Sequence, residues 1–203
     1  MNNSIIFVRV ATKADAKYAD EIVAETQSSA LLRGSGIAKR TPASIVEKIN
    51  AGKVVIAVTA AGEWVGFSYF ESWQKNTFIS NSGLIVAPKF RNSGVAKSIK
   101  NRIFSLSRRL YPEAKIFSIT SGAAIMKMNS QLGFEPVTFA QITQDAAFWE
   151  GCKSCVNYAI LESKNKTNCL CTAMLFSPEH IDLIIASAEN TLKLKQNLNL
   201  KSI

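Results

Sequence analysis

Two spacings of hydrophobic residues alternate along the chain. β-branched and aromatic runs predict strands at 5–10, 54–59, 64–73, 78–87, 114–120 and 137–139. Apolar residues at helical spacing predict helices at 13–32, 42–52, 95–110 and 123–132. Thr41-Pro42 has the residue types that cap and begin a helix. The short turns between 54 and 87 predict an antiparallel meander of three strands.

The last third of the chain follows a different pattern. Two runs, 156–161 and 169–176, predict a β-hairpin joined by a Lys/Asn-rich turn, and Ser177-Pro178-Glu179 predicts a final helix and tail at 177–203. The complete order predicts an α+β (mixed α/β) fold, in which helices flank a mostly antiparallel central sheet. We expect one domain over 1–203, made of a core at 1–140, a cysteine-containing hairpin extension at 141–176 and the C-terminal helix and tail.

Composition narrows the class of protein. The chain has 203 residues, of which 47% are hydrophobic and 19% charged, and this excludes a wholly disordered or collagen-like chain. No apolar run approaches the roughly 20 residues that span a bilayer, and no leader pattern is visible, so a cytoplasmic protein without membrane contact is expected. The net charge of +9 favours anionic partners. No nucleic-acid-binding motif accompanies it, so nucleic acid is not an expected partner.

The most informative stretch runs from Gly83 to Ala96, a predicted strand, a loop and the first turn of a helix. The free amides and partial positive charge of a helix N-terminus can hold a phosphate, Gly94 permits close approach, and Arg91 adds a fixed charge. An ordinary strand-to-helix turn remains the alternative. Neither G-x-x-x-x-G-K-[ST] nor G-x-G-x-x-G occurs in the chain.

The pattern V-x-P-x-x-R-x-x-G-V-A at 86–96 resembles the acyl-CoA motif of the GNAT N-acyltransferase superfamily. The first strand with the helix start at 5–15, and Gln131-Leu132-Gly133-Phe134-Glu135, are also similar to that family. The resemblance implies an acetyl-CoA-dependent transferase. Lys97 or Lys100 would reach the 3′-phosphate, or else lie on a solvated helix face. The implied cofactor contacts are the backbone of Leu84, Ile85 and Val86, the side chain of Arg91, and the amides of Asn92, Ser93, Gly94, Val95 and Ala96.

Two residues are candidates for the chemistry. Many family members place a Tyr acid four residues before the Gly of the G-F pair, where this chain has Asn129. An amide can hydrogen-bond a thiolate but cannot donate a proton as an acid, so Ser121, Ser130 or water would replace the Tyr, or the thiolate would leave unassisted. Glu71, inside an aromatic strand, is the candidate base, with a pKa raised by burial. Surface positions are the alternatives for both residues.

The acceptor is expected to be acidic. Arg33, Lys39 and Arg40 surround a Gly-rich loop between the first two helices, a segment that commonly borders the acceptor pocket in this superfamily. Together with the cysteine segments, this loop resembles a bacterial subgroup, linked with arginine biosynthesis, that acylates glutamate. A dicarboxylate amino acid is therefore expected, with acetyl or succinyl as the acyl group; a solvated basic loop is the alternative. The alternative function for the whole chain is a catalytically degenerate domain that senses acyl-CoA or an amino acid. A homodimer is left open. His180 is expected at the surface.

All four cysteines fall in one short part of the chain, Cys152, Cys155, Cys169 and Cys171. The C-x2-C and C-x-C pairs resemble a four-thiolate structural zinc site in ligand type and number. The predicted hairpin argues against zinc, because it would place Cys155 opposite Met174 and away from Cys171. Structural zinc, buried free thiols and a redox role therefore stay open.

Overall fold

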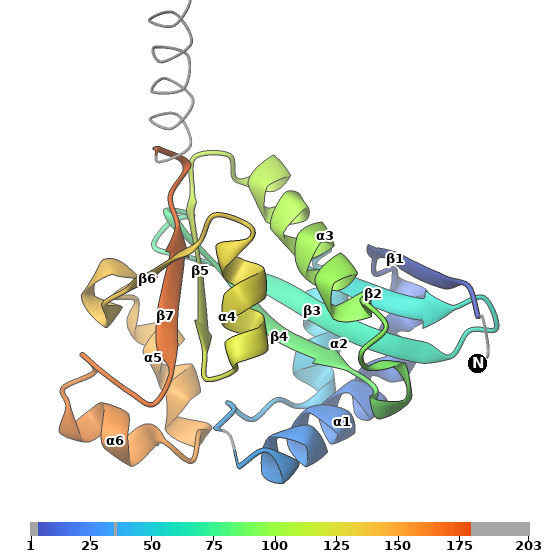
Figure 1. Cartoon of the computed structure of the whole chain (residues 1–203), viewed down its shortest axis with the longest axis horizontal. Coiled ribbons are helices and arrows are strands. Elements are labelled where there is room, and N and C mark those ends of the chain that lie inside the picture. The colour runs from blue at the N-terminus through green and yellow to red at the C-terminus, as the bar shows by residue number, and fades with distance from the viewer. Residues whose placement is uncertain (1–3, 35, 180–203) are drawn as a thin grey trace, which may run out of the picture.

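The computed structural model describes residues 4–34 and 36–179, and within them seven strands form one sheet of order β1-β2-β3-β4-β5-β7-β6 (Figure 1). All neighbouring strands are antiparallel except β4 and β5, which are parallel. The predicted mostly antiparallel sheet is thus confirmed. The strands are β1 Ile6–Val10, β2 Val54–Thr59, β3 Trp64–Trp73, β4 Phe78–Val86, β5 Lys115–Thr120, β6 Glu135–Val137 and β7 Thr172–Phe176.

Helices cover both faces of the sheet. In Figure 1, α3 and α4 lie on the near face, and α1 and α2 lie behind it. A long crossover such as α3 is what a parallel pair like β4 and β5 requires. The α-helices are α1 Ala19–Leu32, α2 Pro42–Asn50, α3 Val95–Leu110, α4 Ala123–Ser130, α5 Ala146–Glu150 and α6 Tyr158–Ser163.

The alternation along β3 separates two hydrophobic cores. Phe70 packs with the buried side of α3, including Ile99 and Ile103. Phe67, on the opposite face, packs with residues of α1 and α2 such as Ile22. Because successive strand residues point to opposite faces, one central strand supplies both cores.

The start of the second helix is as predicted. Thr41 caps α2, because its hydroxyl oxygen accepts a hydrogen bond from the amide of Ser44 at 3.2 Å, and Pro42 is the first helical residue. The first predicted helix is divided: Lys13–Tyr18 is a 3-10 helix, and α1 begins at Ala19.

The predicted hairpin at 156–176 is wrong. Residues 158–163 form α6, and β7 pairs instead with β5 and β6. A short apolar run fits a helix or a strand equally well, and here only Leu161 is fully buried, whereas Val156 is 79% exposed. The segment builds a third core on the outer part of the sheet, in which Trp149 and Leu161 pack with Phe117 of β5.

Two predictions concern the C-terminal end. The predicted helix and tail at 177–203 lie almost entirely outside the described residues, as does His180.

Among the helices that are described, none has the length and apolar character needed to cross a membrane.

An ion pair ties β1 to the turn that follows it. The carboxylate of Asp15 accepts hydrogen bonds from Arg9 at 2.7 and 2.9 Å and from the amide of Thr12 at 2.7 Å. The guanidinium of Arg9 is the main reason why the pKa of Asp15 falls to about 2 from an ordinary 3.8, against the opposing effect of burial. The carboxylate form is therefore favoured by folding.

Asp15→Asn is expected to reduce the pH dependence of stability in acid. A carboxyl whose pKa is lowered by folding stabilises the protein above its unfolded pKa, and this contribution is lost as the pH falls from about 4 toward 2. With allowance for the partly exposed Arg9, we expect the variant to lose about 1 to 2 kcal/mol at pH 7 and little at pH 2. Urea unfolding at both pH values measures this difference. An equal loss at both would contradict the role of the carboxylate charge.

Candidate active site

Strands β4 and β5 separate at the centre of the sheet. They pair only at Phe78–Lys115, Ile79–Ile116 and Ser80–Phe117. Beyond Ser80, β4 stays paired with β3, while β5 stays paired with β7. Among the residues that the structure describes, the second half of β4, including Leu84, Ile85 and Val86, therefore has an edge toward β5 without a strand partner. An extended ligand can hydrogen-bond such an edge.

A bulge marks the place where the strands have separated. Phe67 pairs with Ile85 and Tyr69 with Ser82, so two residues of β4 lie opposite the single residue Ser68. Gly83 within the bulge has a φ of 69°. A Cβ at Gly83 would lie 2.7 Å from the Tyr69 ring, so glycine is needed both for the left-handed backbone and for the close approach of the ring.

The loop after β4 leads to the N-terminus of α3. Asn92 and Gly94 both have left-handed φ values, 61° and 83°. In the described part of the chain, the amides of residues 92–96 donate no hydrogen bond. A Cβ built on Gly94 would meet no atom within 4 Å. The loop, Asn92, Ser93 and Gly94 with the first helical residues Val95 and Ala96, thus presents free amides to open space, as an anion site requires.

Arg91 does not extend freely toward this space. Its Nε donates to the carbonyl oxygen of Val86 at 3.0 Å, and its Nη2 contacts Glu25 at 2.7 Å and Ser29 at 2.6 Å. The guanidinium therefore holds the loop against α1. As a direct phosphate ligand Arg91 stays a prediction, and a role in positioning the loop fits its contacts.

The two lysines proposed for the 3′-phosphate have different environments. Lys97 is exposed in the first turn of α3. Lys100 is only 2% exposed, and its ammonium lies 5.1 Å from the centre of the Phe134 ring. Burial lowers the pKa of Lys100 to about 7. The prediction that Lys100 reaches a phosphate at the surface is thus wrong, as is its alternative of a solvated helix face.

Asn129 lies inside the protein. It is fully buried on α4, so the alternative of a surface position is wrong. Its amide nitrogen contacts the sulfur of Met174 at 3.5 Å, and its side-chain oxygen has no hydrogen-bond partner within the described residues. Ser121 and Ser130, the alternative acids, are both exposed. A buried acceptor without a partner is unusual, and a hydrogen bond from Asn129 to the thiolate or the pantetheine stays a prediction.

Cationic side chains lie around Tyr69, on the face of β3 that packs against α1 and α2. The guanidinium of Arg40 lies 5.4 Å from the centre of the Tyr69 ring, and its Nε donates to the phenol oxygen at 3.3 Å. The ammonium of Lys48, from α2, lies 5.0 Å from the same ring. Lys48 and Lys53 both bind the carboxylate of Glu71, the former at 2.6 Å. We call Arg40, Lys48, Lys53, Tyr69 and Glu71 the cationic cluster; it contains three positive charges and one negative.

The pKa of the Glu71 carboxyl differs from the one predicted from the sequence. Burial alone would raise its pKa, but the hydrogen bonds and charges of Lys48 and Lys53 outweigh burial, and the pKa lies below its ordinary value of 4.5. The predicted raised pKa is wrong. Glu71 is a carboxylate at neutral pH and a weak base.

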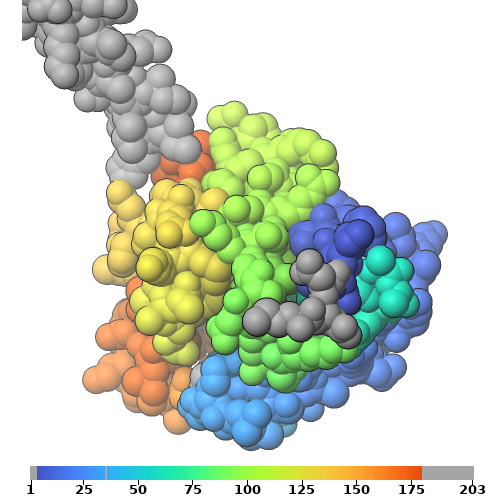
Figure 2. All heavy atoms as spheres, turned by 45° about the vertical axis from the view of Figure 1, so that its right-hand side comes forward, coloured from blue at the N-terminus to red at the C-terminus, as the bar shows by residue number. Residues whose placement is uncertain are grey.

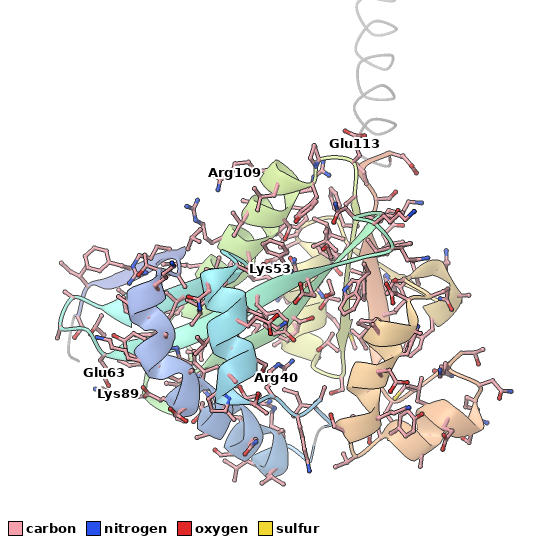
Figure 3. The ribbon with its side chains drawn as sticks, turned by 180° about the vertical axis from the view of Figure 1, so that it is seen from behind. Arg40, Lys53, Glu63, Lys89, Arg109 and Glu113 are labelled. Atoms are coloured by element: carbon pink, nitrogen blue, oxygen red, sulfur yellow. The ribbon has the colours of Figure 1, made fainter. Side chains whose placement is uncertain are left out.

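The structure does not bring the three predicted acceptor residues, Arg33, Lys39 and Arg40, into one site. Arg40 belongs to the cationic cluster (Figure 3). Lys39 is exposed, and its backbone amide donates to the hydroxyl of Ser154 at 2.9 Å; Arg33 is exposed at the end of α1. Sequence reasoning missed Lys48, Lys53 and Tyr69, which approach one another only when α2 packs on the sheet.

The four cysteines line a single cavity beside the third core. All four are free thiols of intermediate exposure. Burial, and then the neighbouring sulfurs, raise the pKa of Cys152 to about 11 and that of Cys171 to about 12. Within residues 4–34 and 36–179, no group of three or more His, Cys, Asp or Glu side chains could hold a metal ion, so the structure gives no support to the structural zinc site considered from the sequence.

Solved structures show where this architecture has been seen before. Rv2747 from Mycobacterium tuberculosis, in complex with CoA, has a TM-score of 0.59 and 16% identity over 84% of this chain and 98% of its own. An acetyltransferase of the GNAT family from Staphylococcus aureus has a TM-score of 0.56 and 14% identity over 70% of this chain and 92% of its own. The protein has the GNAT fold. No family model and no curated protein matches the chain.

The GNAT fold confirms the resemblance seen in the sequence at 86–96, at the level of architecture. N-acetylglutamate synthase from Neisseria gonorrhoeae, complexed with CoA and N-acetyl-glutamate, also shares the fold, with a TM-score of 0.61 and 11% identity. The match covers 87% of this chain but only 36% of that enzyme. The subgroup that acylates glutamate therefore stays a prediction for this chain.

Proposed function

We propose that the protein is an N-acyltransferase that moves an acetyl or related acyl group from acyl-CoA to the amine of a small acidic amino acid. One observation carries the proposal: the unpaired edge of β4 leads directly into the free amides at the start of α3. The edge matches an extended chain that carries amides, and the amides match a pyrophosphate. Pantetheine and the pyrophosphate of CoA have these chemistries in this order.

The site would hold acyl-CoA on the side of α3 and α4. Figure 2 shows α3 and the loop before it, in green, at the surface beside α4 in yellow. The backbone at Leu84–Val86 would bind the pantetheine arm, and the amides of residues 92–96 would bind the pyrophosphate. Arg91 positions the loop through Glu25 and Val86. The exposed Lys97 is available to a further phosphate.

The acceptor would enter from the opposite face of the sheet. Tyr69 lies beside the β4 bulge on this face, because its ring packs on Gly83 and its hydroxyl contacts Arg40. An amine brought here would lie next to the edge where the thioester is expected. Three cations against one carboxylate favour an acceptor with carboxylates.

The transfer needs a free amine, a polarised carbonyl and a departing thiolate. Attack by the amine forms the amide bond and breaks the carbon–sulfur bond, and the proton of the amine goes to water or to the thiolate. The low pKa of Glu71 assigns it to the positioning of Lys48 and Lys53 rather than to a base that works near neutral pH. The buried amide of Asn129 is our candidate to hydrogen-bond the sulfur.

Glu71→Gln is expected to leave the pH dependence of the rate unchanged between pH 6 and 9, because the pKa of Glu71 lies below 4.5. The measurement is kcat/KM against pH for the wild type and the variant. Glu47→Gln, which changes an exposed carboxyl on α2, is the matched control. If Glu71→Gln alone lost one limb of the kcat/KM–pH profile near neutral pH, Glu71 would again be the candidate general base.

Release of free CoA thiol from acetyl-CoA across a panel of amino acids tests the acceptor class. Glutamate or a close relative is expected to exceed leucine in kcat/KM by about tenfold or more, since a charge-assisted contact contributes about 1.5 to 3 kcal/mol. Equal values would contradict an acidic acceptor and leave the acyltransferase proposal intact. Binding of acetyl-CoA without thiol release with any amine would support the sensor reading instead. Competition with succinyl-CoA identifies the preferred acyl group.

A further inference from the structure

Lys100 is a buried cationic side chain to which the mechanism above gives no role. Only 2% of its surface is exposed, and burial lowers its pKa to about 7. Within the described residues its ammonium makes no hydrogen bond or ion pair, and it lies 5.1 Å from the centre of the Phe134 ring. Lysine is rarely buried without a partner, because removing its charge from water is costly. Its position therefore needs an explanation.

Two contacts of α3 fix where Lys100 lies along the sheet. A Cβ on the glycine of β3 that pairs with Val86 would lie 2.7 Å from Cδ1 of Ile99. Two turns further along α3, Ser107 accepts a hydrogen bond from the side-chain amide of Asn81 at 2.8 Å. Lys100 directly follows Ile99, so it lies between these two levels. This is the part of β4 whose edge has no strand partner among the described residues.

Phe134 shows that the ammonium lies on the side of α3 that faces α4. The amide of Phe134 donates to the carbonyl oxygen of Asn129, on α4, at 3.1 Å. The side-chain amide of Asn129 contacts Met174 of β7, which pairs with Ser118 of β5. Ser118 is the first residue of β5 beyond its last pair with β4. The ammonium thus points from α3 toward α4, at the level where β4 and β5 separate (Figure 1).

Two more polar groups at this level lack a partner. In the part of the chain that the structure describes, only three fully buried side-chain nitrogen or oxygen atoms have no hydrogen-bond partner. Two of them are the side-chain oxygens of Asn81 and Asn129. Asn81 follows the last residue of β4 that pairs with β5, and Asn129 lies across the split on α4. Such atoms are rare in folded proteins, so their occurrence beside a buried lysine favours a functional role over a purely structural one.

We infer that Lys100 is a catalytic residue of the acyl transfer, whose ammonium gives its proton to the sulfur of CoA as the carbon–sulfur bond breaks. The inference rests on the proposed function. A pyrophosphate at the start of α3 and a pantetheine arm along residues 84–86 direct the thioester toward the split between β4 and β5, where Lys100 points. The amide of Asn129 can hydrogen-bond the sulfur but cannot act as an acid, so Lys100 supplies the proton.

The protons of this step balance. The attacking amine forms the amide bond, the carbon–sulfur bond breaks, and the proton of Lys100 goes to the departing sulfur. The amine releases one proton to water and Lys100 takes one back from water, so CoA leaves as a thiol and the enzyme returns to its starting form. A pKa near 7 suits this role, because the ammonium is populated at neutral pH and is acidic enough to donate.

The charged surroundings of Lys100 do not change this assignment. Neither β4 nor β7 contains an ionisable residue. Ionisable residues on the neighbouring turns of α3, on α4, on β5 and on β6 are Lys97, Arg102, Lys127, Lys115 and Glu135. Apart from Lys115, which is partly exposed, all of these side chains are exposed. Burial is the cause of the lowered pKa of Lys100, so the pKa responds to a ligand that changes this burial.

Lys100→Met removes the ammonium and keeps an unbranched side chain in the apolar core. We expect kcat to fall about a hundredfold, as for the loss of an acid, and the Kd for acetyl-CoA to stay within about threefold of the wild type. Lys127→Met makes the same change at an exposed position of α4 and is expected to keep its activity. A kcat within about twofold of the wild type in a folded Lys100→Met would overturn the inference.

The pH profile distinguishes an acid from a lysine that only supports the structure. The acceptor must attack as a free amine, so kcat/KM rises about tenfold per pH unit below the pKa of that amine. In the wild type this rise is expected to stop near pH 7, because Lys100 then loses its proton. In Lys100→Met the rise is expected to continue past pH 7. A bend at the same pH in both proteins would overturn the inference.

A contact measurement that needs no turnover separates the inference from the proposed function. In protein with carbon-13 at the lysine Cε atoms, the NMR signal that is missing from Lys100→Met is expected to titrate near pH 7 and to shift when acetyl-CoA is added. The signal missing from Lys127→Met is expected to stay in place. A Lys100 signal that acetyl-CoA does not move would overturn the inference, even if acyl transfer occurs. A shifted signal without transfer to any amine would contradict the proposed function while supporting the contact between Lys100 and the cofactor.

Discussion

Gly94→Trp is expected to abolish binding of acetyl-CoA, with a loss of at least about a hundredfold in affinity. Gly94 has a φ of 83° and borders open space, so an indole would occupy the volume in front of the free amides. The left-handed backbone adds a strain of about 1 to 2 kcal/mol, too small to unfold a typical protein. Titration calorimetry with acetyl-CoA measures the loss directly.

Gly52→Trp is the matched control for that variant. Gly52 also has a left-handed φ, 69°, and a Cβ there would meet no atom within 4 Å. It lies in the turn between α2 and β2, and α2 lies on the face of the sheet opposite α3 in Figure 1. The control is expected to share the backbone strain and to keep its affinity for acetyl-CoA. Unchanged affinity in a folded Gly94→Trp would contradict the assignment of the loop.

Arg40→Ala is expected to raise the KM for an acidic acceptor about tenfold to a hundredfold, as expected for the loss of a charge-assisted contact of about 1.5 to 3 kcal/mol. Arg40 is held against Tyr69 by stacking and by a hydrogen bond, so its guanidinium has a defined position beside the β4 bulge. Initial rates at varied acceptor concentration and saturating acetyl-CoA measure the change. The KM for acetyl-CoA is expected to stay the same.

Arg109→Ala serves as the control for the loss of one positive charge. Arg109 is exposed near the end of α3, and in Figure 3 it lies at the top of the molecule, well above Arg40. Its removal is expected to leave the acceptor KM within about twofold of the wild type. A KM for the acidic acceptor that did not change in Arg40→Ala would contradict the cationic cluster as the acceptor site.

The regular part of the fold could be predicted from the sequence because local signals agreed with tertiary packing. Strands β2, β3 and β4 and helix α3 lie within one residue of their predicted bounds. The run 156–161 lacked that agreement, since its length fits either structure and packing against Trp149 and Phe117 decides in favour of a helix. Long-range packing of this kind leaves no local pattern.

The candidate site was predictable only where it is contiguous in sequence. The loop at 86–96 provides its own backbone amides, so a short motif identifies it. Lys48 comes from α2, Lys53 from the turn before β2 and Tyr69 from β3, and they meet through the fold. The burial of Lys100 could have been predicted from helical spacing, because it lies three residues before Ile103 and four after Ala96 on the inner face of α3. Its positive charge instead favoured a position at the surface.

Transfer of a labelled acyl group tests the central claim most directly. The chain is incubated with acetyl-CoA that carries carbon-13 in the acetyl group and with glutamate, and both products are quantified by mass spectrometry. We predict one labelled N-acetyl amino acid for each free CoA formed, at a rate that Gly94→Trp reduces to background and Gly52→Trp does not. Labelled acetyl-CoA that binds to the wild type but stays intact with every amine offered would contradict the account.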